Sequence, residues 1–142
     1  MKIMAVDYGD ARTGLAVCDR TETLASPVGM IEEKSMAKVA EKIVYASREY
    51  EAGMVVLGLP VNMDGTEGAR AKKTRKLGSI LEKIIDVPLE YWDERNTTKT
   101  AELLLSEAGT FGKKRKQTLD AVAAAVILES YLIYRRSQPL AD

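Results

Sequence analysis

Carboxylate side chains stand beside three apolar segments that lie far apart in the chain. They are Asp7, Asp93, Glu94 and Asp120. Each position has an ordinary structural explanation: a turn anchor, a helix cap with an ion pair, or a favourable charge in the first turn of a helix. Carboxylates that converge on one place repel one another unless cations neutralise them. The spacing therefore raises the hypothesis of a metal site built from these acids.

The amino-acid composition limits the chemistry that such a site could perform. The chain has 142 residues, no histidine, and Cys18 as its single cysteine. Catalytic pairs that need histidine and the usual zinc sites are therefore excluded. Oxygen ligands suit Mg²⁺ or Mn²⁺. Two such ions about 3.5–4 Å apart can activate water and stabilise the departing oxygen in phosphodiester hydrolysis.

Basic residues lie close in sequence to the proposed acids. One basic cluster lies in the segment 70–76. The other is the run before Asp120, which consists of Lys113, Lys114, Arg115 and Lys116. Such side chains fit the phosphates of a nucleic acid, although charge runs are usually solvated surface. The formal net charge is +0 and the pI about 6.4, so any nucleic-acid surface must be local.

Hydrophobic patterns predict the elements that would position these side chains. Alternating or continuous apolar runs indicate strands at 2–7, 13–19, 24–31, 54–59 and 87–92. Pro27 favours an edge position for the third strand. Helical periodicity and capping residues indicate helices from Ser35 to before Gly53, 69–85, Thr97 or Thr98 to Ala108, and 118–136, with a loop at 109–117.

This order of elements predicts an α/β fold with a mixed five-stranded sheet flanked by helices. Three antiparallel strands come first, and two strands parallel to the first one follow. Ligand sites in such sheets lie at the carboxyl ends of the strands. Asp7, the loop after Leu59, and the pair at 93–94 all fall at that edge. Asp120 shares its helical face with apolar residues, so its carboxylate needs a partner.

Length and composition predict one domain over residues 1–136 and a flexible tail at 137–142. No segment is long and apolar enough to span a bilayer, so no membrane partner is expected. The amino terminus lacks the pattern of a signal peptide, and the single cysteine excludes an internal disulfide. We therefore expect a cytoplasmic protein.

Four motifs occur in order along the chain. They are D-x-G-x-x-R-x-G at 7–14, Gly58-Leu59-Pro60 followed by Asn62-Met63-Asp64-Gly65, Asp93-Glu94-Arg95 followed by two threonines, and the lysine-rich run that precedes Asp120 and two alanines. With these motifs the chain resembles the YqgF family of Holliday junction resolvases and pre-16S rRNA nucleases, within the ribonuclease H-like superfamily. The resemblance covers nearly the whole chain.

The resemblance implies a ribonuclease H-like fold in which Asp7, Glu94 and Asp120 hold divalent metal and catalyse hydrolysis. Strand phase alone leaves Asp93 open as the ligand in place of Glu94. It further implies that Arg12, Asn62 and Arg95 lie on the substrate side or support the site. Two positions depart from the family pattern, Asn96 and Glu129, and neither is one of the proposed acids.

The sequence thus favours a Mg²⁺- or Mn²⁺-dependent endonuclease that uses two metal ions. Its substrate would be structured nucleic acid, either the 5′ end of an rRNA precursor or branched DNA. A junction resolvase needs paired active sites, so monomer and homodimer both remain open. One alternative is a non-catalytic RNA- or protein-binding module on a nuclease fold. Another is an actin-like ATPase, which would need a second lobe that this chain does not repeat.

Overall fold

The computed structural model describes residues 1–97 and 115–138, with side chains of the last helix described from Ala121 onward. The expected helix up to Ala108 lies outside this description, apart from Thr97. The elements in chain order are β1 (Ile3–Asp7), β2 (Arg12–Cys18), β3 (Ala25–Glu32), α1 (Met36–Glu49), β4 (Met54–Leu59), α2 (Ala69–Ile84), β5 (Leu89–Asp93), the short 3₁₀-helix η1 (Glu94–Asn96) and α4 (Arg115–Ser137).

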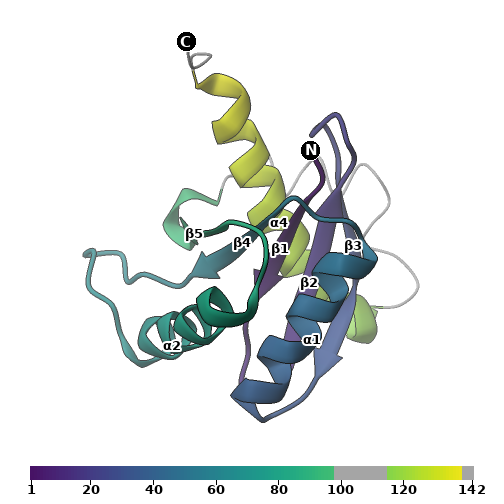
Figure 1. Ribbon diagram of the computed structural model, residues 1–142. Helices are drawn as coiled ribbons and strands as arrows, with labels where there is room; N and C mark the ends of the chain where they lie inside the picture. Colours follow the sequence, from purple (N-terminus) through teal and green to yellow (C-terminus); the bar gives the residue numbers. More distant parts are fainter. Residues whose placement is uncertain (98–114, 139–142) are drawn as a thin grey trace.

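The five strands form one mixed sheet in the order β3-β2-β1-β4-β5, as the sequence predicts. β2 pairs antiparallel with both β1 and β3, whereas β4 runs parallel to β1 and to β5. The carboxyl ends of β1, β4 and β5 therefore meet at one edge of the sheet (Figure 1). We call this edge, with the turns that leave it, the carboxyl edge.

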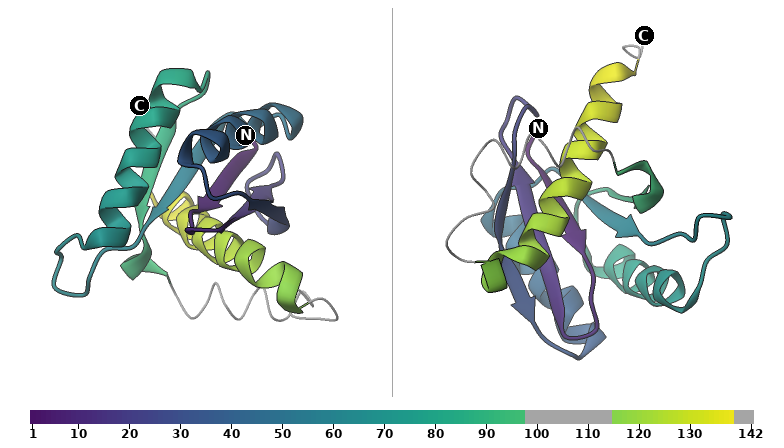
Figure 2. Two further views of the ribbon diagram at one scale, coloured as in Figure 1. Left: turned by 90° about the horizontal axis from the view of Figure 1, so that it is seen from below. Right: turned by 180° about the vertical axis from the view of Figure 1, so that it is seen from behind.

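Helices cover both faces of the sheet (Figure 2). Alternate side chains of β1 explain how the two sides are filled: Ile3 and Ala5 pack toward α4, whereas Met4 and Val6 pack toward α1 and α2. All six residues of β4 are buried, because this central strand is covered on both faces. That is the physical reason for its unbroken apolar sequence.

The ends of several elements match their sequence signals. The Ser35 side chain accepts a hydrogen bond from the Lys38 backbone N–H at 3.4 Å and so caps α1, as predicted. β5 begins at Leu89 rather than at residue 87, because Pro88 has no N–H to donate to the sheet. The predicted loop at 109–117 is wrong at its end, since α4 already begins at Arg115. Arginine, lysine and glutamine are good helix formers and extend it.

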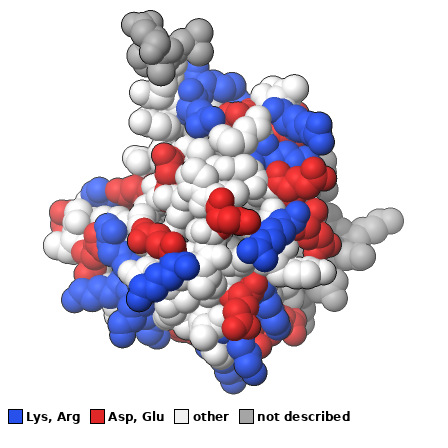
Figure 3. Space-filling view, in the orientation of Figure 1, with Lys and Arg blue, Asp and Glu red and all other residues white. Residues whose placement is uncertain are grey.

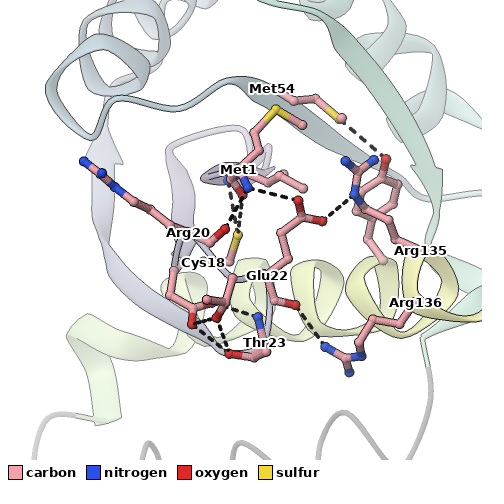
Figure 4. A network of polar contacts seen from close by, with 12 residues as sticks. Met1, Cys18, Arg20, Glu22, Thr23, Met54, Arg135 and Arg136 are labelled. Atoms are coloured by element: carbon pink, nitrogen blue, oxygen red, sulfur yellow. Dashed lines mark hydrogen bonds and ion pairs between the residues drawn. The ribbon is translucent and has the colours of Figure 1, made fainter. Parts of the chain in front are cut away.

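The carboxyl-terminal half of α4 is tied to the turn between β2 and β3 (Figure 4). The Glu22 carboxylate accepts hydrogen bonds from Arg135 and, at 3.1 Å, from the amino group of Met1, while Arg136 donates to the Glu22 backbone carbonyl at 3.1 Å. Nearby, the buried Glu129 accepts a hydrogen bond from the Ala25 backbone N–H at 3.3 Å. Glu129 thus holds α4 against β3.

The helix α4 includes Ser137, which the sequence placed in the tail. Nothing in the described part of the chain forms a helix with the length and apolar character needed to cross a membrane.

Candidate active site

Asp7 is the last residue of β1 and lies half-buried at the carboxyl edge. The chain then turns sharply into β2, and Asp7 pairs with Gly14 across the two strands. A Cβ atom on Gly9 would lie 2.3 Å from the Arg12 carbonyl oxygen. Only glycine therefore fits this turn, which gives a steric reason for the D-x-G spacing that places Asp7 at the edge.

The two acids after β5 point to different partners. Asp93 caps η1 by accepting from the Arg95 backbone N–H at 2.9 Å, and its carboxylate pairs with the Arg95 guanidinium at 2.7 Å. The Glu94 side chain instead lies against the end of β4. Its carboxyl carbon is 3.5 Å from the position that a Cβ atom on Gly58 would occupy. Because β4 lies between β5 and β1, Glu94 approaches the end of β1.

The electrostatics of Glu94 agree with this placement. Burial raises the pKa of Glu94, the negative charge of Asp7 raises it further, and Arg70 opposes both, so that the pKa reaches about 7. A carboxylate with this environment is short of positive charge. A divalent cation that contacts both Asp7 and Glu94 would relieve the desolvation and the repulsion together.

The third predicted ligand, Asp120, lies in α4 with its side chain outside the described residues. Within the described residues, no three or more acids and cysteines are grouped so that they could hold a metal. The structure therefore brings together two of the proposed acids, Asp7 and Glu94. It turns Asp93 toward Arg95.

A hollow of about 440 Å³ opens beside Glu94. The β4–α2 loop, the first turn of α2 and η1 line it, with Asn62, Arg70, Glu94 and Arg95 among the lining residues. Asn62 also shapes the loop, since its amide donates to the Thr66 hydroxyl at 3.0 Å. We call this hollow the Glu94 pocket. It contains two of the three residues predicted on the substrate side.

The third of these residues, Arg12, lies elsewhere. It is exposed at the start of β2 and lines a separate hollow of about 430 Å³ with residues of β3 and of the segment that follows it. Lys113 and Lys114 fall outside the described residues. Arg115 and Lys116 form the start of α4, and their side chains are not among those described.

The largest hollow described, about 920 Å³, lies between β5 and the carboxyl-terminal half of α4. Its lining includes Trp92, Tyr131 and Tyr134, and it contains neither Asp7 nor Glu94. A choice of site by pocket volume alone would thus select a place that contains neither proposed acid. We place the candidate active site at the smaller Glu94 pocket, because Glu94 lines it and Asp7 lies close enough for its charge to act on Glu94.

The basic cluster of α2 separates into different environments in the folded chain. Lys73 pairs with Asp10 at 3.2 Å, and Arg75 pairs with Glu67 and lies over the Tyr91 ring at 5.0 Å. Arg70 alone of these three lines the Glu94 pocket. On the face of the molecule that α1 and α2 cover, basic and acidic side chains are intermingled (Figure 3). In the sequence Arg70 is one of several basic residues of the segment 70–76, and its place two residues after Gly68 is the signal that sets it apart.

Comparison with known proteins identifies the family of the chain. The model of the RuvX family, described as Holliday junction resolvase, matches residues 1–134. The chain belongs to this family. It is 42% identical over 135 residues to a protein of Halothermothrix orenii named "Putative pre-16S rRNA nuclease", covering 95% of this chain and 96% of the relative. A protein of Heliobacterium modesticaldum with the same name is 41% identical over 132 residues, covering 93% and 89%.

Solved structures confirm the ribonuclease H-like fold of this RuvX-family member. RuvC of Thermus thermophilus, in complex with a Holliday junction substrate, matches with a TM-score of 0.65 at 13% identity, covering 96% of each chain. A fowlpox virus resolvase in complex with Holliday junction DNA matches with a TM-score of 0.58 at 13% identity, covering 95% of this chain and 99% of that one. The family model and the relatives' shared name make the chain a member of a nuclease family.

Proposed function

We propose that this protein is a metal-dependent endonuclease that cuts structured nucleic acid, with the 5′ region of pre-16S rRNA as its substrate. The observation that carries the proposal is the meeting of Asp7 and Glu94 at the carboxyl edge, beside the Glu94 pocket. The names of relatives that share about two fifths of its residues support an rRNA precursor. The description of the family model supports branched DNA as the second candidate.

The donor set fits Mg²⁺ or Mn²⁺. Asp7 and Glu94 would hold the metal, and we place Asp120 with them because α4 packs across β3, β2 and β1, on the face of the sheet that Ile3 and Ala5 of β1 fill. When bound, a pair of such ions would activate water and stabilise the departing oxygen of a phosphodiester. We favour Glu94 over Asp93 as the ligand, since the Asp93 carboxylate is already paired with Arg95.

The remaining residues of the pocket would act on the substrate itself. Arg95 is exposed and holds its guanidinium at the rim, where it can meet a phosphate. Asn62 would keep the β4–α2 loop in shape through its bond with Thr66. Lys113, Lys114, Arg115 and Lys116 would add phosphate contacts from the segment before Asp120.

The proposal is tested by cleavage of a labelled pre-16S rRNA 5′ fragment and of a four-way DNA junction, each with Mg²⁺, with Mn²⁺ and with EDTA. We expect metal-dependent cutting of the RNA fragment. Asp7→Asn, Glu94→Gln and Asp120→Asn should each lower the rate by about 100-fold or more, in the range seen for groups that stabilise the transition state.

Asp10→Asn is the matched control, because Asp10 lies in the same turn as Asp7 but is exposed and paired with Lys73. It should cut at the wild-type rate. Preferential cutting of the junction would reassign the substrate to branched DNA. The non-catalytic module would be favoured instead if the protein binds either substrate without cutting it and if Asp7→Asn leaves the binding affinity unchanged.

A further inference from the structure

The first turn of α2 brings a cationic side chain to the Glu94 pocket. Arg70 is the second residue of this helix and is exposed. Its side chain lines the pocket together with Asn62, Glu94 and Arg95. Arg70 therefore lies at the same pocket as Glu94 and Arg95 of η1, close enough for its charge to act on Glu94.

The contacts of Arg70 place its guanidinium at the end of β1. Its Nη2 atom donates a hydrogen bond to the Tyr8 backbone carbonyl at 3.4 Å. This bond is long and exposed, so it costs little to exchange it for another acceptor. The contact shows that the side chain points toward the residue that directly follows Asp7.

Two other basic residues of α2 are paired with acids elsewhere. Lys73 pairs with Asp10, and Arg75 makes a two-point pair with Glu67 while it covers the Tyr91 ring. An arginine presents five N–H donors in a planar fork that suits phosphate oxygens. Arg70 thus combines a donor set suited to phosphate with a position in the lining of the pocket that contains Glu94.

We propose that Arg70 binds a backbone phosphate next to the bond that is cut, and so holds the nucleic acid against Asp7 and Glu94. The inference rests on the proposed function, because it assumes that the Glu94 pocket receives a nucleic acid. A phosphate contact of this kind carries no sequence information. Arg70 would therefore serve affinity and register rather than sequence choice.

The test measures binding apart from cutting. Binding is titrated in the Asp7→Asn background over a range of salt concentrations. The two ligands are the pre-16S rRNA 5′ fragment and an RNA of equal structure but altered sequence. Arg70→Ala should weaken binding of both RNAs by about tenfold or more. It should also reduce the slope of log affinity against log salt by about 0.7–0.9, the value of one lost phosphate contact.

Arg48→Ala is the matched arginine control. Arg48 lies in the last turn of α1, where it makes an exposed pair with Asp86 at 3.5 Å. The helix α1 leads into the amino end of β4, so its last turn lies at the opposite edge of the sheet. This variant should leave both the affinity and the salt slope unchanged. Arg70→Lys should restore the slope, because it restores the charge.

Two results would overturn the inference. One is a salt slope for Arg70→Ala equal to that of its parent. The other is a combination of two findings: the Tm of Arg70→Ala falls by more than about 5 °C, and Arg70→Lys does not restore the salt slope. Arg70 would then only hold α2 against β1. If the wild-type protein cuts neither substrate, the proposed function fails, but the salt slope still decides the role of Arg70.

Discussion

At the scale of single residues, two neighbouring acids of similar chemistry acquire opposite properties. The hydrogen bond from Arg95 lowers the pKa of Asp93. Burial and the charge of Asp7 raise the pKa of Glu94 to about 7. Asp93 is thus a satisfied cap, whereas Glu94 is a carboxyl group that gains from a cation. The environment, rather than the type of side chain, separates the two roles.

The raised pKa of Glu94 makes the stability of the metal-free protein depend on pH. The unfolded value is near 4.5 and the folded value is about 7, so the native state binds more protons between these values. The contribution of Glu94 to stability is therefore fully present below about pH 4.5 and is lost as the pH rises to about 7. Glu94→Gln has no such loss.

We therefore expect Glu94→Gln to be more stable than the wild type at pH 8 in EDTA, with a difference that shrinks toward pH 5. Urea denaturation at both pH values measures it. Mn²⁺ should raise the stability of the wild type at pH 8 and leave that of Glu94→Gln nearly unchanged. A difference that stays constant from pH 5 to pH 8 would show that Glu94 is not desolvated.

At the scale of elements, Gly58 sets how closely three of them approach. It lies in β4, opposite Trp92 of β5. A Cβ atom there would lie 2.6 Å from Cδ1 of Ile127 in α4 and 3.5 Å from the carboxyl carbon of Glu94. The missing side chain therefore lets α4 pack on the sheet while Glu94 folds back over the end of β4.

Gly58→Ala should accordingly destabilise the protein by about 1–3 kcal/mol through overpacking. Ile127→Val removes the Cδ1 atom that the new methyl group meets. The double variant should therefore recover part of the loss, and a double-mutant cycle in urea should give a coupling of about 0.5 kcal/mol or more. Strictly additive effects would mean that α4 shifts freely to make room.

At the scale of the whole molecule, Glu22 joins parts that are distant in sequence. Its carboxylate contacts the amino terminus and Arg135, and its backbone carbonyl accepts from Arg136 (Figure 4). The hydrogen bonds from Arg135 and from the amino group outweigh the effect of burial, so the pKa of Glu22 is lowered. This network fixes α4, the helix that carries Asp120, across the sheet.

Glu22→Gln should lower the free energy of unfolding by about 1–3 kcal/mol, the range for hydrogen bonds to charged groups. Chemical denaturation at pH 7 measures the change. Acetylation of the amino terminus should weaken the wild type and have little further effect on Glu22→Gln, because both changes remove the same pair. Glu41→Gln, an exposed position on α1, is the control and should change stability by less than about 0.5 kcal/mol.

The sequence alone predicted the mixed sheet with its antiparallel and parallel strands, the exact bounds of β4 and the cap of α1 at Ser35. These features follow from local signals: hydrophobic period, continuous burial and side-chain capping. Boundaries shifted where a competing local property acted, as at Pro88 and at the start of α4. The sequence also brought Asp7 and the acids after β5 to one edge, because parallel strands share the direction of their carboxyl ends.

Only the tertiary structure distinguished Glu94 from Asp93, placed Arg70 in the pocket and set Arg12 apart from it. The direction of the side chains after β5 depends on the turn of η1 and on the space over Gly58. Neither can be predicted from the alternation of side chains along the strand. The partners of each lysine and arginine on α2 depend on contacts across the fold, where residues such as Asp10 and Glu67 compete for them. Local sequence sets which elements form, whereas through-space distances decide which charges meet.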